Sequence, residues 1–142
     1  MLRDIEILNN RLSMDSFKQI LNKINVIRPV GSKNHTIVRE VEIYSSTFFQ
    51  FIERELRASG WEVTLDTFSE ITIIGNLTFT NVIATINPSA SRLIILSCHY
   101  ESKMLRNFYG TIDSAVSCSI IVNIAKTLSE LLHMSKVCNF CG

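Results

Sequence analysis

Two short segments carry most of the side chains that could do chemistry, residues 97–103 (Ser-Cys-His-Tyr-Glu-Ser-Lys) and residues 113–118 (Asp-Ser-Ala-Val-Ser-Cys). His99 follows a run of aliphatic residues, and Asp113 stands where a helical pattern begins. Because ligands of open α/β sheets bind beyond the carboxyl ends of the strands, both side chains are expected at one edge. Zinc accepts nitrogen and oxygen ligands at about 2 Å. His99 and Asp113 are therefore a candidate zinc site.

Each of these residues also has a structural explanation. Asp113 is placed to cap the following helix by accepting hydrogen bonds from its free N–H groups, and taken alone this interpretation is favoured. A lone His99 is more often a structural histidine, and Glu101 and Lys103 can form a solvated loop pair. Ser114 fits a helix start, and since no G-x-S-x-G motif surrounds it, acyl-enzyme chemistry is not expected.

Four cysteines stand at Cys98, Cys118, Cys138 and Cys141, a lower density than in small disulfide-built domains. Cys138 and Cys141 have the spacing of half a zinc knuckle or of a redox pair. The second half-site and the βαβ setting are both absent from the sequence, which favours an incidental pair.

Helical periodicity appears in three places. Apolar residues share one stripe over Met14–Ile24, which is followed by a loop at Pro29–Ser32. A stronger pattern runs from Thr36 to Ser59, with Gly60 where a helix end favours glycine. A last helix is predicted after Asp113.

The segment between these helices has the pattern of strands. Trp61–Asp66 alternates apolar and polar residues, residues 69–76 have turn composition, and Thr78–Ile86 indicates a second strand. Leu93–Leu96 is a continuous aliphatic run, which is typical of a strand covered on both faces. A covered strand that leads through the loop 99–112 into a helix is an α/β element.

Composition excludes several classes of protein. The chain is 46% hydrophobic and 19% charged with a net charge of +1, so disorder, nucleic-acid binding and binding to anionic membranes are not expected. No apolar run approaches the roughly 18 residues of a membrane span, and Asp4 and Glu6 interrupt any signal-like N-terminus. The sequons at Asn34 and Asn76 matter only in a secretory compartment.

The two segments with reactive side chains, residues 97–103 and 113–118, resemble motifs of the glutaminyl-peptide cyclotransferases. In that family the corresponding motifs are Cys-His-Tyr-Asp-Ser-Lys and Gly-Ala-Thr-Asp-Ser-Ala-Val-Pro-Cys. Further matches follow in the family's order, namely Arg28–Gly31, Gly60–Val63, Asp66–Phe68, Thr80–Thr85 and Asn87–Pro88. The resemblance is strongest over residues 14–133, whereas 134–142 match nothing in the family. It identifies residues 1–142 as the N-terminal portion of one domain with a three-layer α/β/α zinc-aminopeptidase-like fold and a mixed central sheet.

This resemblance implies a reaction and a cofactor. The family converts the N-terminal glutamine of peptides and proteins to pyroglutamate with release of ammonia, using one Zn²⁺ per full-length domain as a Lewis acid. Asp113 aligns with the aspartate zinc ligand, and His99, Glu101, Lys103 and Ser114 lie next to it. A monomer without a membrane span is the expected state.

The two motif cysteines align with a disulfide of the secreted family members. A Cys98–Cys118 bond forms in an oxidising compartment, so the resemblance implies the secretory pathway although no signal peptide is visible.

Departures from the family pattern bear on activity. The Glu-Glu pair that supplies the second zinc ligand and the general base, and the late histidine ligand, are expected beyond Gly142. Glu130 and His133 do not fit these roles, while Glu101 replaces the usual aspartate and Ser117 the usual proline. No catalytic residue is therefore assigned within the chain, and the chain alone is expected neither to bind zinc tightly nor to cyclise glutamine. The alternatives are a zinc aminopeptidase of the same clan, in which His99 would be a ligand, and a non-catalytic truncated homologue.

Overall fold

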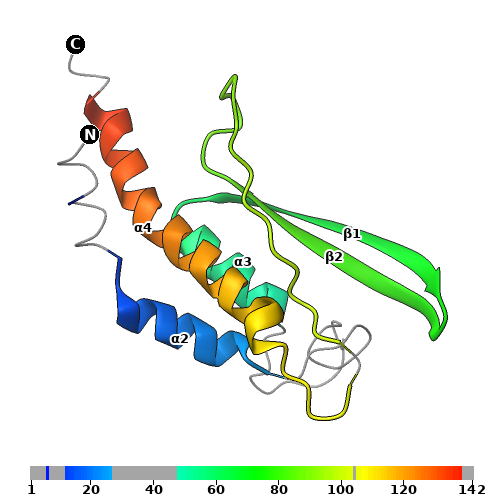
Figure 1. The fold of residues 1–142 in the computed structure, drawn as a ribbon. Helices are drawn as coiled ribbons and strands as arrows, with labels where there is room; N and C mark the ends of the chain where they lie inside the picture. The colour runs from blue at the N-terminus through cyan, green and yellow to red at the C-terminus, as the bar shows by residue number, and fades with distance from the viewer. Residues whose placement is uncertain (1–5, 7–11, 27–47, 104, 139–142) are drawn as a thin grey trace.

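The computed structural model describes residue 6 and residues 12–26, 48–103 and 105–138. Its elements are α2 (Met14–Ile24), α3 (Phe48–Ala58), β1 (Glu62–Thr72), β2 (Gly75–Thr85), the irregular helical segment η1 (Thr111–Val116) and α4 (Ser117–Cys138). Three helices pack together, and a two-stranded hairpin extends away from them (Figure 1). Helices beside a sheet are consistent with part of an α/β domain.

The helix predicted over Met14–Ile24 is confirmed as α2. Its start is stabilised by the Ser13 side chain, which accepts a hydrogen bond from the Ser16 N–H at 3.1 Å. Ile20 and Ile24 lie on the stripe facing the other helices and are buried. The loop predicted at 29–32 lies outside the described residues.

Helices α3 and α4 supply most of the core. The core cluster includes Phe51, Ile52 and Leu56 of α3 and Cys118, Val122 and Ala125 of α4. At its edge the Trp61 indole N–H donates to the Ala125 carbonyl at 3.1 Å, and Lys126 pairs with Glu55 at 2.5 Å. The helix predicted over residues 36–59 is confirmed for Phe48–Ala58, and its earlier part is not described.

Strands β1 and β2 form an antiparallel hairpin in which Glu62 pairs with Thr85 and Thr72 with Gly75. The predicted turn over 69–76 is too long, because only Ile73 and Ile74 separate the strands. Cross-strand contacts extend the ladder: Phe68 stacks on Phe79, and hydroxyl pairs join Thr67 to Thr80 and Ser69 to Thr78. Val63, Val82 and Ala84 pack the base of the hairpin on the core.

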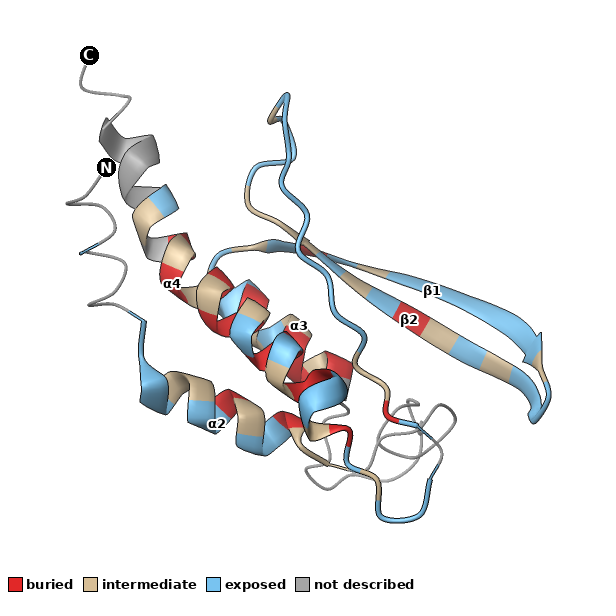
Figure 2. Ribbon diagram, in the orientation of Figure 1, coloured by how far each residue is buried: buried red, intermediate tan, exposed pale blue. Residues whose placement is uncertain are grey.

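The prediction of a covered strand at Leu93–Leu96 is wrong for this structure. No strand includes these residues, and their side chains are 62, 93, 84 and 57% exposed. The segment is an irregular, exposed trace in Figure 2. Aliphatic residues identify a covered strand only when neighbouring strands cover it, and the described residues place none beside this segment.

Residues Thr111–Ser129 are long and apolar enough, by length and composition, to cross a membrane. The core helix of a domain passes the same test, and here Cys118, Val122 and Ala125 pack in a core with residues of α2 and α3. The predicted absence of a membrane span stays a prediction.

Candidate functional site

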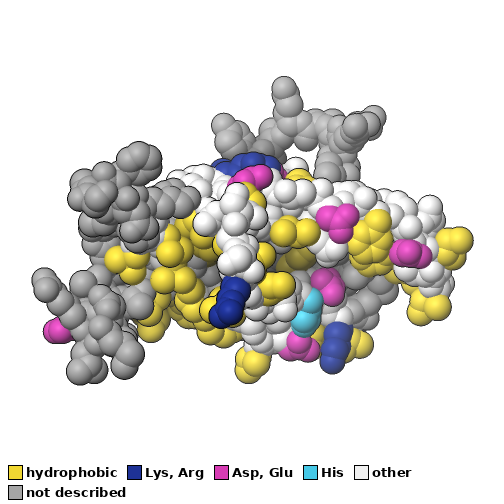
Figure 3. Space-filling view, turned by 90° about the horizontal axis from the view of Figure 1, so that it is seen from above, with side chains coloured by type: hydrophobic (Ala, Val, Ile, Leu, Met, Phe, Trp, Pro, Cys, Tyr) yellow, Lys and Arg dark blue, Asp and Glu magenta, His cyan; other side chains and the backbone are white. Residues whose placement is uncertain are grey.

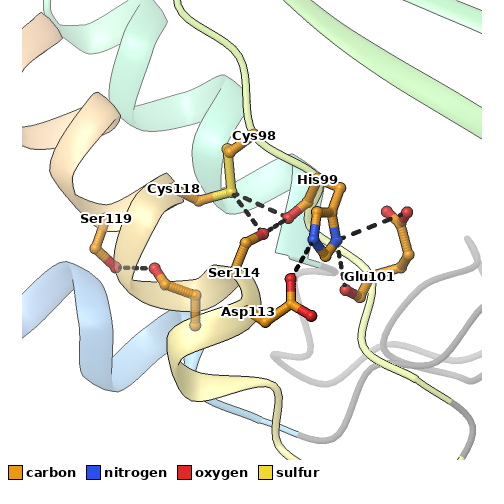
Figure 4. Close-up of a disulfide and its surroundings, with 8 residues drawn as sticks. Cys98, His99, Glu101, Asp113, Ser114, Cys118 and Ser119 are labelled. Carbon is orange, nitrogen blue, oxygen red and sulfur yellow. Dashed lines mark hydrogen bonds and ion pairs between the residues drawn. A yellow bond between two sulfur atoms is a disulfide. The ribbon is translucent and has the colours of Figure 1, made fainter.

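A disulfide between Cys98 and Cys118 fixes the site segment to the first turn of α4 (Figure 4). The two Cα atoms are 5.5 Å apart, which lies within the usual range for disulfides. The bond closes a loop with a sequence separation of 20. In the chain-entropy model such a loop contributes about 3 kcal/mol to stability. The residue after Cys98 is thereby held against the kink before α4.

His99 and Asp113 meet at this kink. The His99 Nε2 atom lies 2.8 Å from the Asp113 Oδ1 atom, and the His99 Nδ1 atom lies 3.1 Å from the Glu101 carbonyl oxygen. Both side chains are about half exposed, at 47% and 56%. An imidazole held between a carbonyl and a carboxylate has a fixed ring orientation, so the pair presents a defined polar surface to solvent.

Charged groups on both sides complete the cluster. The Glu101 carboxylate lies 3.8 Å from His99 Nδ1, and the Lys103 ammonium lies 4.0 Å from Asp113 Oδ2. Figure 3 shows a histidine on the surface between acidic side chains, with a basic side chain nearby. The structure therefore brings together all of the predicted polar residues of the site. Because the cluster is exposed, these ion pairs add little stability.

Ser114 is buried beneath the pair, and its hydroxyl donates to the His99 carbonyl. That oxygen also lies 3.3 Å from the Cys118 sulfur, which has no hydrogen to donate because it is part of the disulfide, so the hydrogen bond comes from Ser114. Ser114 is thus a structural contact of His99, and its oxygen faces no open surface.

Asp113 does not act as the helix cap that its position in the sequence suggested. Its carboxylate contacts His99 and Lys103, and the Ala115 N–H donates to the Gly110 carbonyl instead. The Asp113 backbone has φ −113° and ψ 82°, outside the helical region, which marks a kink inside η1. The side chain is thereby directed to the surface and not along the helix axis.

Gly110 permits the close backbone approach at this kink, a role that the sequence patterns missed. It has a φ of +58°, in the left-handed region that glycine adopts without steric cost. A Cβ placed there would lie 2.6 Å from the Asp113 carbonyl oxygen and 3.1 Å from the Ser102 Cβ. Glycine in the motif was the available signal, since close backbone approach is one reason for that residue.

Two long-range hydrogen bonds also escaped sequence analysis. The Tyr100 hydroxyl donates to the Thr80 carbonyl of β2 at 2.7 Å, and the Thr111 hydroxyl donates to the Asn25 side chain after α2 at 2.7 Å. Burial raises the pKa of Tyr100, and the Glu101 charge adds to this, against the lowering effect of the bond to Thr80. These contacts fix the site segment to the hairpin and to α2, and no local pattern encodes them.

The donor atoms of the described site fit only part of a zinc site. Zinc sites use at least three protein ligands, and the described residues contain no group of three or more His, Cys, Asp or Glu side chains that could hold a metal. Asp113 offers a carboxylate with His99 as its hydrogen-bond partner. The described part of the chain therefore fits one contribution to a zinc site and does not fit a complete one.

The chain is similar both to the model of a protein family and to individual known proteins. Residues 81–137, which include the whole cluster, match the model of Peptidase family M28. The chain is also similar to glutaminyl-peptide cyclotransferases, with 41% identity over 122 residues to the enzyme of Drosophila melanogaster and 37% to a Glutaminyl-peptide cyclotransferase-like protein of Bos taurus. The structure of Macrostomum lignano glutaminyl cyclase superimposes with a TM-score of 0.74 at 38% identity. The resemblance found in the motifs, and the α/β fold class, are confirmed.

These similarities cover most of this chain but a minor part of each relative. The matches span 84% and 82% of this chain, and 32% and 29% of the two cyclotransferases. For the solved structure the values are 88% and 36%. The chain thus spans about a third of the length of the relatives it matches.

Proposed function

We propose that this chain forms part of a glutaminyl-peptide cyclotransferase, which converts N-terminal glutamine of peptides or proteins to pyroglutamate and releases ammonia. The observation that carries the proposal is the M28-matching segment, in which His99, Glu101, Lys103 and Asp113 converge. Its sequence and fold are similar to those of cyclotransferases at 37–41% identity.

In this proposal Asp113 is the metal ligand that the chain contributes to a single Zn²⁺. The ion would supply Lewis-acid activation of the glutamine side-chain amide. His99 holds one carboxylate oxygen of Asp113, and Lys103 adds a positive charge beside the other. The remaining ligands and the general base are assigned to residues that the relatives have outside the matched third.

The same proposal includes the domain, the oligomeric state and the cellular compartment of the protein. Residues 1–142 belong to one cyclotransferase-like domain, a monomer without nucleic-acid partners that acts in the secretory pathway or outside the cell. The Cys98–Cys118 disulfide supports an oxidising compartment, because such bonds are rare where thiols are kept reduced.

A chimera tests the activity. This chain replaces its matching region in the Drosophila melanogaster cyclotransferase, and the product is assayed on an N-terminal glutamine peptide and an N-terminal leucine peptide. The expected result is pyroglutamate formation without release of leucine. Asp113→Asn should abolish turnover, whereas the matched change Asp66→Asn, on the exposed hairpin, should not.

A second function is favoured by one specific observation, the match to a peptidase family. A zinc aminopeptidase would use His99 as a metal ligand as well as Asp113. Leucine release without pyroglutamate would establish that function and reject the cyclotransferase. A folded chimera inactive on both peptides would leave a non-catalytic homologue.

A further inference from the structure

The hairpin tip, residues 71–76, carries three exposed isoleucines. Ile73 is fully exposed, and Ile71 and Ile74 are 89% and 51% exposed. This end of the hairpin extends away from the helices and is largely exposed in Figure 2. Single exposed aliphatic residues are common, but a cluster of them favours association with other molecules unless something bulky and polar lies beside it.

A glycosylation motif of the form Asn-x-Thr stands at the same tip. It comprises Asn76–Thr78 and begins one residue after Gly75, where β2 starts. Its middle residue is leucine, whereas the similar triplet at residues 87–89 has the proline that the motif excludes. In a secretory compartment such an asparagine is an attachment site for an oligosaccharide on the surface of a protein.

The fold leaves the side chain of Asn76 open to attachment. Asn76 and Thr78 are both exposed, and they lie on one face of the hairpin because side chains alternate along a strand. Asn81 on the same strand donates to Asp66 at 3.0 Å, whereas the Asn76 amide has no hydrogen-bond partner among the described residues. A sugar on the Asn76 amide therefore breaks no contact of the described fold.

The register of the hairpin places this amide beside the isoleucines. Asn76 pairs directly with Ile71 across the ladder. Paired residues project from the same face of a sheet with Cβ atoms about 4.5–5.5 Å apart. Ile73 and Ile74 form the turn between the two strands. A bulky, solubilising glycan on Asn76 thus starts next to Ile71 and close to the turn.

We propose that Asn76 carries an N-linked oligosaccharide and that this glycan covers the three isoleucines of the hairpin tip. The donor is an oligosaccharide linked to a lipid diphosphate. The Asn76 amide nitrogen forms a bond to the first sugar carbon and loses a proton. The bond from that carbon to the diphosphate oxygen breaks, and its electron pair leaves with the lipid diphosphate. The inference rests on the secretory compartment of the proposed function and is independent of zinc and catalysis.

Secretion of the full 142-residue chain from mammalian cells, behind an added signal peptide, tests the attachment. An amidase that removes N-glycans converts each glycosylated asparagine to aspartate, and the reaction is run in heavy-oxygen water so that only this conversion is labelled. Peptide mass spectrometry should then find labelled aspartate in place of Asn76. Asn87, whose triplet contains proline, should remain asparagine.

Changes within the motif separate attachment at Asn76 from other modifications. Asn76→Gln and Thr78→Val should each lose this glycan, because the first lacks the acceptor and the second lacks the hydroxyl of the motif. Thr78→Ser keeps the hydroxyl and should keep the glycan. Asn34→Gln makes the matched change at the other sequon and should leave the glycan on Asn76.

Hydroxyl-radical footprinting tests whether the glycan covers the tip. Oxidation of Ile71, Ile73 and Ile74 should be at least about twofold lower in the glycosylated chain than in Asn76→Gln, because the sugar restricts access of the radical. Met14 is exposed at the start of α2 and should be oxidised equally in both proteins.

Each part of the proposal has a result that would overturn it. An unmodified Asn76 in the secreted chain, or a glycan retained there in Thr78→Val, would reject the attachment. Equal oxidation of the three isoleucines with and without the glycan would reject the covering. Because the signal peptide is supplied and no turnover is measured, these results bear on Asn76, whereas failure of the proposed activity would appear in the chimera assay.

Discussion

At the scale of single residues, the site is organised by what His99 contacts. The His99 ring lies between the Asp113 carboxylate and the Glu101 carbonyl. The main-chain carbonyl of His99 accepts a hydrogen bond from the Ser114 hydroxyl. In the proposed site Asp113 binds the metal, and His99 is a positioning residue that acts through that carboxylate.

Removing His99 should therefore weaken zinc binding without unfolding the protein. In the chimera, His99→Ala is expected to raise the zinc dissociation constant about 10–100-fold, the usual effect of losing a hydrogen-bond partner of a ligand. Its melting temperature should hardly change, since the ring is half exposed. His99→Gln, whose amide can donate to the same oxygen, should retain part of the affinity. A complete loss of zinc in both variants would make His99 a ligand, as in an aminopeptidase.

The raised pKa of Tyr100 predicts that the stability of the chain depends on pH. Burial, with the Glu101 charge, raises its pKa in the folded chain, so the folded state favours the neutral phenol. The contribution of the neutral Tyr100 phenol to the free energy of unfolding is complete below about pH 10, the usual tyrosine pKa. It is lost as pH rises through the higher pKa of the folded state.

Denaturant unfolding of the chain between pH 8 and pH 11 measures this effect. Tyr100→Phe also removes the hydrogen bond to Thr80 and should lower the free energy of unfolding by about 1 kcal/mol at pH 8. The difference between wild type and variant should shrink at the alkaline end. A difference that is constant with pH would show that the phenol keeps its ordinary pKa.

At the scale of elements, the kink inside η1 places Asp113, and Gly110 allows that kink. Sequence periodicity predicted α2 over its observed range and the described part of α3, because helix patterns depend on local spacing. Two strands were predicted here with too long a turn between them, since the observed ladder depends on cross-strand pairs such as Phe68 with Phe79. The kink itself depends on the close approach of the Gly110 backbone to the Asp113 carbonyl, which the spacing of apolar side chains does not predict.

Gly110→Ala should disturb the site more than Gly75→Ala does. Both glycines have positive φ, so each change should cost about 1–3 kcal/mol of stability. Only at Gly110 would the new Cβ meet the Asp113 carbonyl, whereas nothing lies within 4 Å at Gly75. The His99 ring resonances in NMR should shift in Gly110→Ala alone. Equal shifts in both variants would contradict this account of the kink.

At the scale of the whole molecule, the described helices and hairpin form a core beside an aliphatic segment that stays exposed. The motifs predicted the family, the gathering of the polar site residues and the disulfide, because short dense motifs fix local chemistry. They could not predict whether Leu93–Leu96 is covered, since that depends on strands distant in sequence or on another polypeptide. In the proposed function, the chain therefore contributes one part of a larger site.

Zinc stoichiometry in the chimera tests the central claim, that Asp113 is a metal ligand of a cyclotransferase site. Metal analysis of the purified protein should give about one zinc per chain for the chimera and for Asp66→Asn. Asp113→Asn keeps the shape of the side chain without its charge and should hold at most about a tenth of that zinc at equal folding. Equal zinc in Asp113→Asn and Asp66→Asn would contradict the account.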